Sequence, residues 1–334
     1  MVATAVLLVV VLLLVSGLRW AAGGKTIHLA HGSGIIESIP DAIEQYPTPS
    51  HTLSVMAWNL GYCLGTAEQP ADALEASTVY DRLDHIVETI AGAGAEVVLL
   101  QAVDFRSRRT RDIDQLHYIA TALGWGFAAR ALTWECRYIP YPIWPVGRTT
   151  GPVQAGMGVI SRFPIQQNMR QRLHHPSHFL SVQFHPFATV QQVDVQCGTQ
   201  TVRLFNVHLS GGAGEDQLRQ ARLLVAFVQQ MATANSVLMG SLQADTASSD
   251  VAMTFIAEGL RNRMHRIDDK RPAPPEMPSY SRFDHLFVAA GLQHLETEVL
   301  LPQQPVTMHP ALLTQLRWHL PMLTQDGRNS HERL

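Results

Sequence analysis

The sequence predicts a mixed α/β or α+β sandwich that forms one domain over residues 51–334. Strand-like and helix-like apolar patterns alternate along this part of the chain, and several predicted strands follow one another directly. Ala95–Val103 is a continuous apolar run, which is typical of a strand that is buried on both faces. No internal repeat is visible, so a single layered body is expected.

The elements of this sandwich are justified in chain order by their periodicity. Apolar residues spaced three or four apart, such as Leu83, Ile86, Val87 and Ile90, predict helices at Tyr80–Ala91, Asp114–Leu123 and Asp216–Met231. Short apolar or alternating runs predict strands at Leu53–Leu60, Ala95–Val103, Gly158–Phe163, Phe179–Phe184, Thr189–Val195, Thr201–Leu209, Ser236–Leu242 and Phe283–Ala289. Four prolines between residues 272 and 278 mark a loop before the last of these strands.

The chain begins with an apolar run, Val2–Leu18, inside a hydrophobic segment of residues 1–23. We expect an uncleaved transmembrane anchor, because no Lys or Arg precedes the run as in a typical secretory signal. A cleaved signal is the alternative, since small residues follow Trp20, and a helix buried in the domain is the third possibility. Arg19 and Lys25 weakly favour a cytoplasmic C-terminal side. Residues 24–50 are rich in Gly, Pro and Ser and predict a linker.

Composition excludes several classes of protein. Hydrophobic residues make up 46% of the chain and charged residues 16%, which argues against a disordered protein. The net charge is -3 and the pI is near 6.6, so nucleic acid is not the expected partner. Three cysteines, Cys63, Cys136 and Cys197, show no metal-site spacing and do not indicate a redox compartment.

Seven polar-ended strings occur in a recognisable order. They are Asn59 at the end of MAWNL, LLQAVD (99–104), GMGVISRFPI (156–165), FNVHLSGG (205–212), VLMGSLQAD (237–245), RFDHLFVAAGL (282–292) and NSHERL (329–334). From about residue 52 to 334, this ordered set resembles the endonuclease/exonuclease/phosphatase superfamily, which has the DNase I-like fold. The resemblance implies a four-layer α/β-β/α sandwich and Mg²⁺-dependent hydrolysis of phosphoesters, in which the ion neutralises phosphate charge while an activated water attacks.

The resemblance can be carried over residue by residue. Asn59 matches a polar metal ligand, and Asn206 and His208 match a motif whose histidine donates to the phosphate. Asp284 matches the aspartate that orients the final histidine, which the ending of the chain places at His331. Family members usually continue with a strand after that histidine, whereas only three residues follow His331.

At other family positions, the residue that binds metal or orients the water is replaced. Ala102 stands where the metal-binding Glu belongs, and Ser241 and Gln243 stand where an Asp and an Asn orient water and phosphate. Ser330 also replaces a carboxylate. A general base typically contributes about 10²- to 10⁴-fold, and Mg²⁺ prefers carboxylate oxygens, so weak metal binding is expected. Asp104 and Asp245 are possible substitute ligands, because each lies two residues beyond a degenerate position.

Four arginines in six residues, Arg106, Arg108, Arg109 and Arg111, follow the second motif. They predict binding of an anionic substrate or lipid headgroup, with a solvated loop as the alternative. Three weaker features each have a structural alternative. These are a histidine cluster (His174, His175, His178, His185), an aromatic lip (Tyr138–Pro145) and a glycine loop (Gly211–Gly214).

Taken together, the sequence predicts a membrane-anchored or exported pseudoenzyme of this superfamily. It would bind a phosphorylated small molecule, a lipid headgroup or a protein partner without efficient hydrolysis. The alternative is an active metal-dependent phosphoesterase or phosphodiesterase with an altered metal site.

Overall fold

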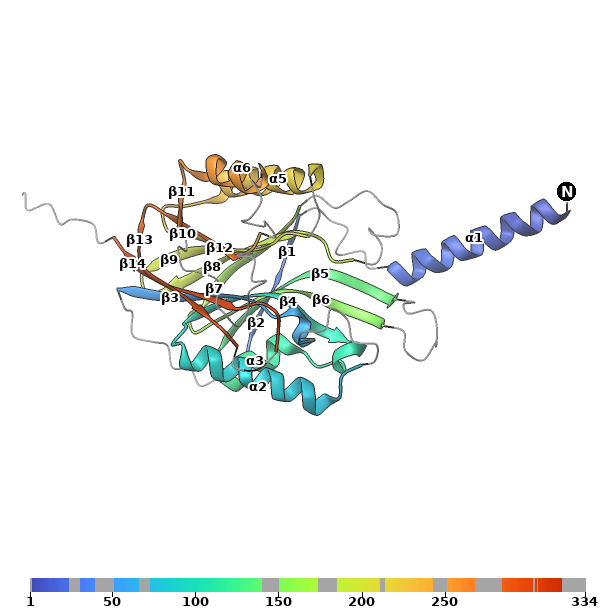
Figure 1. Cartoon of the computed structure of the whole chain (residues 1–334), viewed down its shortest axis with the longest axis horizontal. Helices are drawn as coiled ribbons and strands as arrows, with labels where there is room; N and C mark the ends of the chain where they lie inside the picture. The colour runs from blue at the N-terminus through green and yellow to red at the C-terminus, as the bar shows by residue number, and fades with distance from the viewer. Residues whose placement is uncertain are drawn as a thin grey trace, which may run out of the picture.

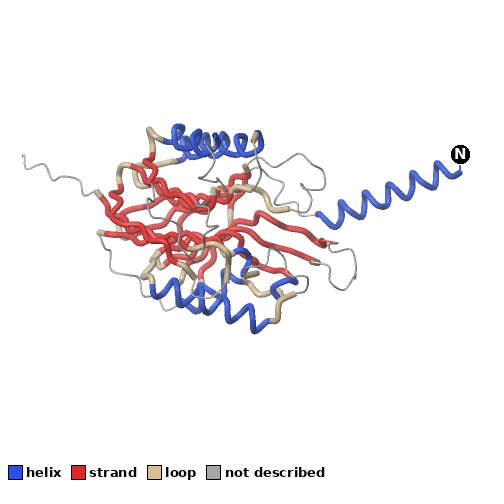
Figure 2. The backbone as a smooth tube through the Cα atoms, viewed as in Figure 1, coloured by secondary structure: helices blue, strands red, loops and turns tan. Residues whose placement is uncertain are grey.

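A computed structural model shows two β-sheets packed face to face, with helices on the outer face of each (Figures 1 and 2). It describes residues 2–23, 31–39, 51–65, 73–139, 150–173, 185–210, 214–242, 251–267, 284–302, 304 and 306–319. This is the four-layer α/β-β/α arrangement predicted from the resemblance, and the prediction of the fold is confirmed.

Each sheet contains seven strands. Sheet A has the order β1 (His31–Ser33), β7 (Ile165–Arg172), β8 (Thr189–Cys197), β9 (Gln200–His208), β10 (Ser236–Ser241), β12 (Asp284–Ala289) and β11 (Met264–Ile267). Sheet B has the order β13 (Leu292–Leu300), β14 (Ala311–Trp318), β3 (Thr52–Asn59), β4 (Val97–Ser107), β6 (Gly151–Ser161), β5 (Phe127–Ile139) and β2 (Ile35–Ser38).

Amphipathic helices cover the outer faces of both sheets. Helices α2 (Ala76–Gly92) and α3 (Gln115–Leu123) bury their apolar stripes against sheet B. Helices α5 (Glu215–Met231) and α6 (Val251–Leu260) do the same against sheet A. The carboxylate of Asp114 accepts a hydrogen bond from the amide of His117 and so caps the start of α3.

Two parallel strand pairs determine where polar side chains can gather. β3 runs parallel to β4 in sheet B, and β9 runs parallel to β10 in sheet A. Near the ends of these strands, the side chain of Gln101 on β4 donates to that of Asn206 on β9. The C-terminal ends of all four strands therefore lie at the same end of the sandwich, which we call the His208 end.

The prediction of a linker over residues 24–50 is wrong for residues 31–39. β1 pairs with β7 of sheet A, and β2 pairs with β5 of sheet B, so this short segment crosses from one sheet to the other. Gly34 makes the crossing possible, because a Cβ there would lie 2.1 Å from the side chain of Asn168. The two strands are only three and four residues long, too short to show a period.

The hydrophobic N-terminus forms helix α1 (Val2–Ala22), which projects away from the sandwich (Figure 1). Its side chains are exposed up to its last turn, where Ala21 and Ala22 are buried and the helix contacts β5. The alternative of a helix buried in the domain is therefore wrong. The helix is long and apolar enough to cross a membrane, as an anchor or as a signal sequence.

Several elements were not predicted. They include β5, β7, α6, β13 and β14. Strand β14 matters most for the site, because it pairs with β3 in the middle of sheet B. The strand predicted at Phe179–Phe184 lies outside the described residues.

Candidate functional site

Three side chains form a row across sheet A at the His208 end. Ser241 on β10 pairs directly with His208 on β9 and with Asp284 on β12. Side chains of directly paired residues lie on the same face of a sheet. Leu204, Met239 and Leu286, which lie on the same faces of these strands, belong to the core between the sheets. The row therefore faces sheet B at the mouth of the sandwich.

On sheet B, Asn59 at the end of β3 pairs with Gln101 in the middle of β4. The Oδ1 of Asn59 accepts a hydrogen bond of 3.0 Å from the amide of Gly61, which turns the chain at the end of the strand. Gln101 is fully buried, and its Oε1 has no hydrogen-bond partner in the described structure. Asn59 is thus the predicted ligand that reaches this end, but part of its acceptor capacity is used locally.

Asn206 joins the two sheets. Its Nδ2 lies within hydrogen-bonding distance of the carbonyls of Leu100 and Gly158, at 3.0 and 3.3 Å, and of Gln191 Oε1 at 3.2 Å. Its Oδ1 accepts a bond of 2.7 Å from Gln101 Nε2. Because the side chain is fully buried and bonded on both sides, it stabilises the sandwich, and the predicted catalytic role for Asn206 has no support in these contacts.

His208 lies beside a second histidine, His309. The pKa of His208 is lowered to about 4, mainly by burial and to a smaller extent by the positive charge that the nearby His309 would carry. Burial also lowers the pKa of His309. The backbone oxygen of His309 accepts a bond of 2.9 Å from Trp58 Nε1 on β3, which ties its loop to sheet B. Both rings are therefore neutral at pH 7 and can act as hydrogen-bond donors or acceptors.

His309 was missed by sequence reasoning, which placed the final histidine at His331, outside the described residues. A signal was available. A strand is expected after the final histidine, and β14 begins two residues after His309. The string Thr307-Met308-His309 was overlooked because Met308 stands where a carboxylate is expected. Thr307 Oγ1 donates to the backbone oxygen of Asn59 and so fixes this loop at the site.

Asp284 is a half-buried carboxylate for which the described part of the chain shows no charged partner. Its Oδ1 makes no hydrogen bond within the described structure. Burial raises the pKa of Asp284 to about 7, so the group is about half protonated at neutral pH. Together with His208, Ser241 and His309, it gives this end of the sandwich three titratable groups and a hydroxyl.

Comparison with known proteins identifies the family. The model of the endonuclease/exonuclease/phosphatase family matches residues 56–308 of this chain. The chain belongs to that family. A search of curated protein sequences finds no match.

Solved structures share the DNase I-like fold of this family member. An endonuclease/exonuclease/phosphatase from Beutenbergia cavernae is 20% identical, with a TM-score of 0.58, over 80% of this chain and 72% of that one. The human Nocturnin catalytic domain is 16% identical, with a TM-score of 0.54, over 86% and 97% of the chains. A mannosyl-6-phosphatase from Bacteroides thetaiotaomicron is 12% identical, with a TM-score of 0.51, over 80% and 100%. These similarities show the fold.

Ala102, which the sequence predicts to stand at the family's metal-binding Glu position, has an unusual backbone conformation. Ala102 has a φ of 50°, in the left-handed region, where the pairing of β4 with β6 is interrupted. Leu100 and Val103, three residues apart, both belong to the core under the helices of sheet B. The bulge therefore changes the alternation of faces, and the reason for expecting Asp104 to replace a ligand at position 102 no longer holds.

Asp104 has a structural role in this family member, which corrects its prediction as a substitute metal ligand. Arg109 binds both of its carboxylate oxygens, at 2.7 and 2.9 Å, and Thr110 Oγ1 donates to Oδ2 at 2.9 Å. The guanidinium of Arg109 lies 4.0 Å from the ring centroid of Tyr62 and 4.8 Å from that of Trp134. The prediction of Arg109 as a substrate ligand is wrong for the same reason, since its side chain is 9% exposed.

The other three predicted arginines are exposed. Arg106 has 66% of its side chain exposed and lies 3.9 Å from Asp112, while Arg111 pairs with Glu75 at 3.0 Å. Arg108 is exposed beside Gly151. These side chains remain able to meet an anionic partner.

The described residues at the His208 end do not by themselves fit the Mg²⁺ that the family implies. Among the described residues, no group of three or more Asp, Glu, His or Cys side chains could hold a metal ion. Among the described side chains at the His208 end, Asp284 is the one carboxylate, and the other oxygen ligands are the amides of Asn59 and Gln101 and the hydroxyl of Ser241. Mg²⁺ requires octahedral oxygen ligands with enough charge to replace its water. Gln243 and Asp245 lie outside the described residues.

Several weaker predictions fall mostly outside the described residues. His174, His175 and His178, the greater part of the aromatic lip and Gly211–Ala213 belong to this group. His185 is described and exposed, and Gly214 precedes α5.

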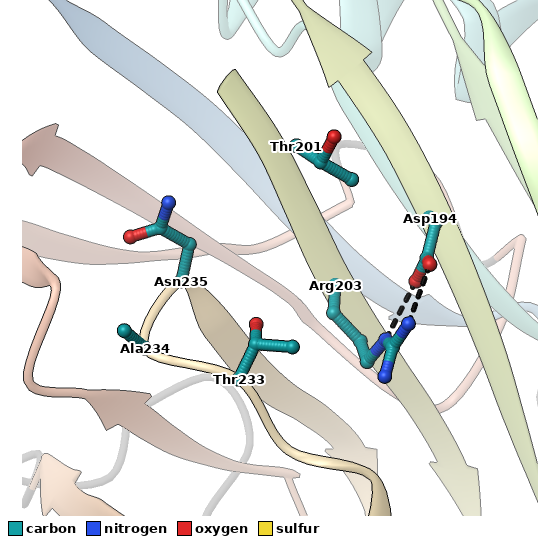
Figure 3. A pocket seen from close by; sticks show the side chains of 6 residues that line it. All are labelled: Asp194, Thr201, Arg203, Thr233, Ala234 and Asn235. Atoms are coloured by element: carbon teal, nitrogen blue, oxygen red, sulfur yellow. Dashed lines mark hydrogen bonds and ion pairs between the residues drawn. The ribbon is translucent and has the colours of Figure 1, made fainter.

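A pocket of about 310 Å³ lies at the opposite end of sheet A (Figure 3). It is lined by Asp194, Thr201, Arg203, Thr233, Ala234 and Asn235. Arg203 binds both carboxylate oxygens of Asp194, at 2.7 and 2.6 Å, as Figure 3 shows. The two charged groups of this pocket therefore neutralise each other, which leaves the His208 end as the candidate site.

Proposed function

We propose that this family member is membrane-anchored, binds a phosphorylated ligand at the His208 end and hydrolyses it inefficiently or not at all. One observation carries the proposal. His208, Ser241, Asp284 and His309 gather at this end, while Ala102 and Ser241 occupy the positions where family members carry acids. Donors for a phosphate are thus retained without the carboxylates that would hold a catalytic cation.

The chemistry of the retained groups supports binding. A neutral His208 or His309 can donate one N–H to a phosphoryl oxygen, and the Ser241 hydroxyl can donate another hydrogen bond. Asp284 in its protonated form adds a donor and avoids repulsion of the anion. Hydrolysis also requires neutralisation of the phosphate charge and an activated water, and the described residues supply neither.

A hydrolysis assay tests the proposal. The full chain in detergent would be offered sphingomyelin, inositol phosphates, nucleic acid and a generic phosphodiester, with Mg²⁺ or Mn²⁺. We expect turnover no higher than background, and binding of the phosphate-containing ligands that His208→Ala weakens by about tenfold, the loss of one good hydrogen bond. Arg263→Ala, an exposed residue at the opposite end, is the matched control.

A restored site gives the complementary test. Ala102→Glu, Ser241→Asp and Gln243→Asn together return the family's ligands, and we expect metal-dependent hydrolysis to appear. Ala102→Gln, Ser241→Asn and Gln243→Asn provide a neutral control of similar size. If neither triple variant shows metal-dependent hydrolysis, the residue assignments are contradicted.

The alternative function is an active phosphoesterase with an altered site. It is favoured by the retention of His208, His309 and Asp284, which are the titratable groups of this end. Metal-dependent turnover by the unmodified chain, abolished by His208→Ala, would establish this function and reject inefficient hydrolysis.

A further inference from the structure

The C-terminal end of helix α1, which we call its exit, lies at the His208 end of the sandwich. Its last turn contacts β5, and a Cβ on Gly23 would lie 3.6 Å from the guanidinium carbon of Arg137. Arg137 lies near the C-terminal end of β5, which pairs through Ile139 with Gly151 at the start of β6. The start of β6 in turn pairs with the end of β4. Figure 1 shows α1 leaving beside the free ends of β5 and β6.

Exposed arginines surround this exit. Arg106, Arg108 and Arg137 are exposed, and Arg19 lies in the last turn of α1. The side chain of Arg108 lies beside Gly151, so it is next to the start of β6. Arg111 and the acidic Glu75, Asp112 and Glu135 are also near this exit, so the described residues there include five arginines and three carboxylates.

We propose that the His208 end faces the lipid bilayer and that Arg106, Arg108 and Arg137 bind anionic lipid headgroups. This inference rests on the proposed anchoring of α1 in a membrane. The helix is 21 residues long, about 32 Å at 1.5 Å per residue, which matches a bilayer core. Because α1 packs on β5 where it ends, the sandwich lies directly against the surface, and the site opens toward headgroup phosphates.

Fluorescence quenching in nanodiscs tests the orientation. A fluorophore is attached to Pro152→Cys at the start of β6, or to Asn262→Cys at the opposite end; both residues are exposed. The three native cysteines are buried and react slowly. With headgroup spin-labelled lipid in discs of phosphatidylcholine and phosphatidylserine, we expect several-fold stronger quenching at position 152 than at 262. Equal quenching, or stronger quenching at 262, overturns the proposal.

Charge variants test the arginines in the same discs. An arginine near an anionic surface contributes about 1 kcal/mol, so removing three should lower the ratio of docked to undocked molecules by roughly 100-fold. We expect Arg106→Ala/Arg108→Ala/Arg137→Ala, or 0.5 M NaCl, to reduce quenching at position 152 to the value in pure phosphatidylcholine. The matched control, Arg261→Ala/Arg263→Ala/Arg317→Ala, should keep it. An unchanged signal in the first variant contradicts headgroup binding.

Two further measurements distinguish a failure of the anchoring, a wrong orientation of the sandwich and a folding defect of the variants. Release of the chain from discs by alkaline washing would show that α1 is not an anchor, and so would reject the anchoring and the orientation together. Hydrogen exchange of the unlabelled chain avoids any folding defect of the cysteine variants. Amides of residues 106–112 should exchange about tenfold more slowly in phosphatidylserine-containing discs than in phosphatidylcholine discs, and equal rates overturn the proposal.

Discussion

Two carboxylates of the sandwich, Asp104 in sheet B and Asp284 in sheet A, have opposite environments. Asp104 is bound by Arg109 and Thr110 in a closed cluster with aromatic rings above the guanidinium. Asp284 has no charged partner, and its Oδ1 has no hydrogen bond in the described structure. A carboxylate that is fully paired stabilises the fold, whereas one that is buried without a partner costs stability and is available to a ligand. The comparison therefore distinguishes the acid that stabilises the fold from the acid that we propose meets the ligand.

The largest expected effect comes from breaking the paired side. Asp104→Ala leaves the charge of Arg109 buried and uncompensated, which should reduce the free energy of unfolding by about 3–5 kcal/mol. The measurement is urea unfolding of the full chain in detergent, followed by near-UV circular dichroism. Glu75→Ala, which removes an exposed partner of Arg111, should change it by at most about 0.5 kcal/mol. If the two variants lose the same amount, Asp104 is not structural.

Removing the carboxylate of Asp284 should raise the free energy of unfolding at alkaline pH, whereas removing that of Asp104 lowers it. Because burial raises its pKa to about 7, the folded protein holds a proton that the unfolded chain has lost, and stability falls as the pH rises from about 4 to about 7. Asp284→Asn removes this fall. At pH 8 the variant should be more stable than the wild type by about 2 kcal/mol, after allowance for partial exposure, with no difference near pH 4. Parallel stability curves from pH 4 to 8 would show that the carboxylate is not strained.

His208 extends the comparison of pH-dependent stability to a basic side chain. Its pKa is lowered to about 4, so its contribution to stability is complete above pH 6.5 and is lost as the pH falls toward 4. His208→Gln should lose less stability than the wild type over this range, with a relative gain of about 1–2 kcal/mol at pH 4.5. The same unfolding series at pH 4.5 and 7.5 measures it, and an equal loss in both proteins contradicts a buried neutral ring.

The smallest effect tests one bond of the paired cluster. Thr110→Val keeps the shape of a fully buried side chain but removes the hydroxyl that donates to Asp104. We expect a loss of about 1.5 kcal/mol, the lower end of the range for a hydrogen bond to a charged group. Unfolding midpoints in urea would show it, and Thr201→Val on the exposed start of β9 is the control. A loss above that of Asp104→Ala would mean that the cluster is held by something other than the ion pair.

Much of the fold could be predicted, because the buried strands and amphipathic helices carry strong periodic signals. The runs Leu53–Leu60 and Tyr80–Ala91 became β3 and α2 with boundaries shifted by a few residues. β1, β2 and β11 could not be predicted, since three or four residues show no period. These strands form because the backbone groups of their partner strands hydrogen-bond to them, and their own sequences show no strand pattern.

The site was predicted only in part. The row of His208, Ser241 and Asp284 follows from motifs at strand ends, and the sheet register brings them together. Asp104 was misjudged because the bulge at Ala102 is a backbone feature that side-chain alternation cannot reveal. Arg109 was misjudged because its buried ion pair with Asp104 depends on the fold and cannot be read from a cluster of arginines. His309 was missed because its motif is degenerate, although the strand after it was a usable signal.

The crossing segment of residues 31–39 has a consequence for the order of assembly. It leaves the ribosome early, but its partners come much later: Ile35 pairs with Arg130, and His31 pairs with Gln171. Until about residue 172 has been synthesised, this segment has unpaired backbone groups while α1 is already complete. Such distant pairing is slow and leaves strand edges exposed. Helix α1 is therefore made first, and the segment of residues 31–39 that follows it in the chain pairs with both sheets late in folding.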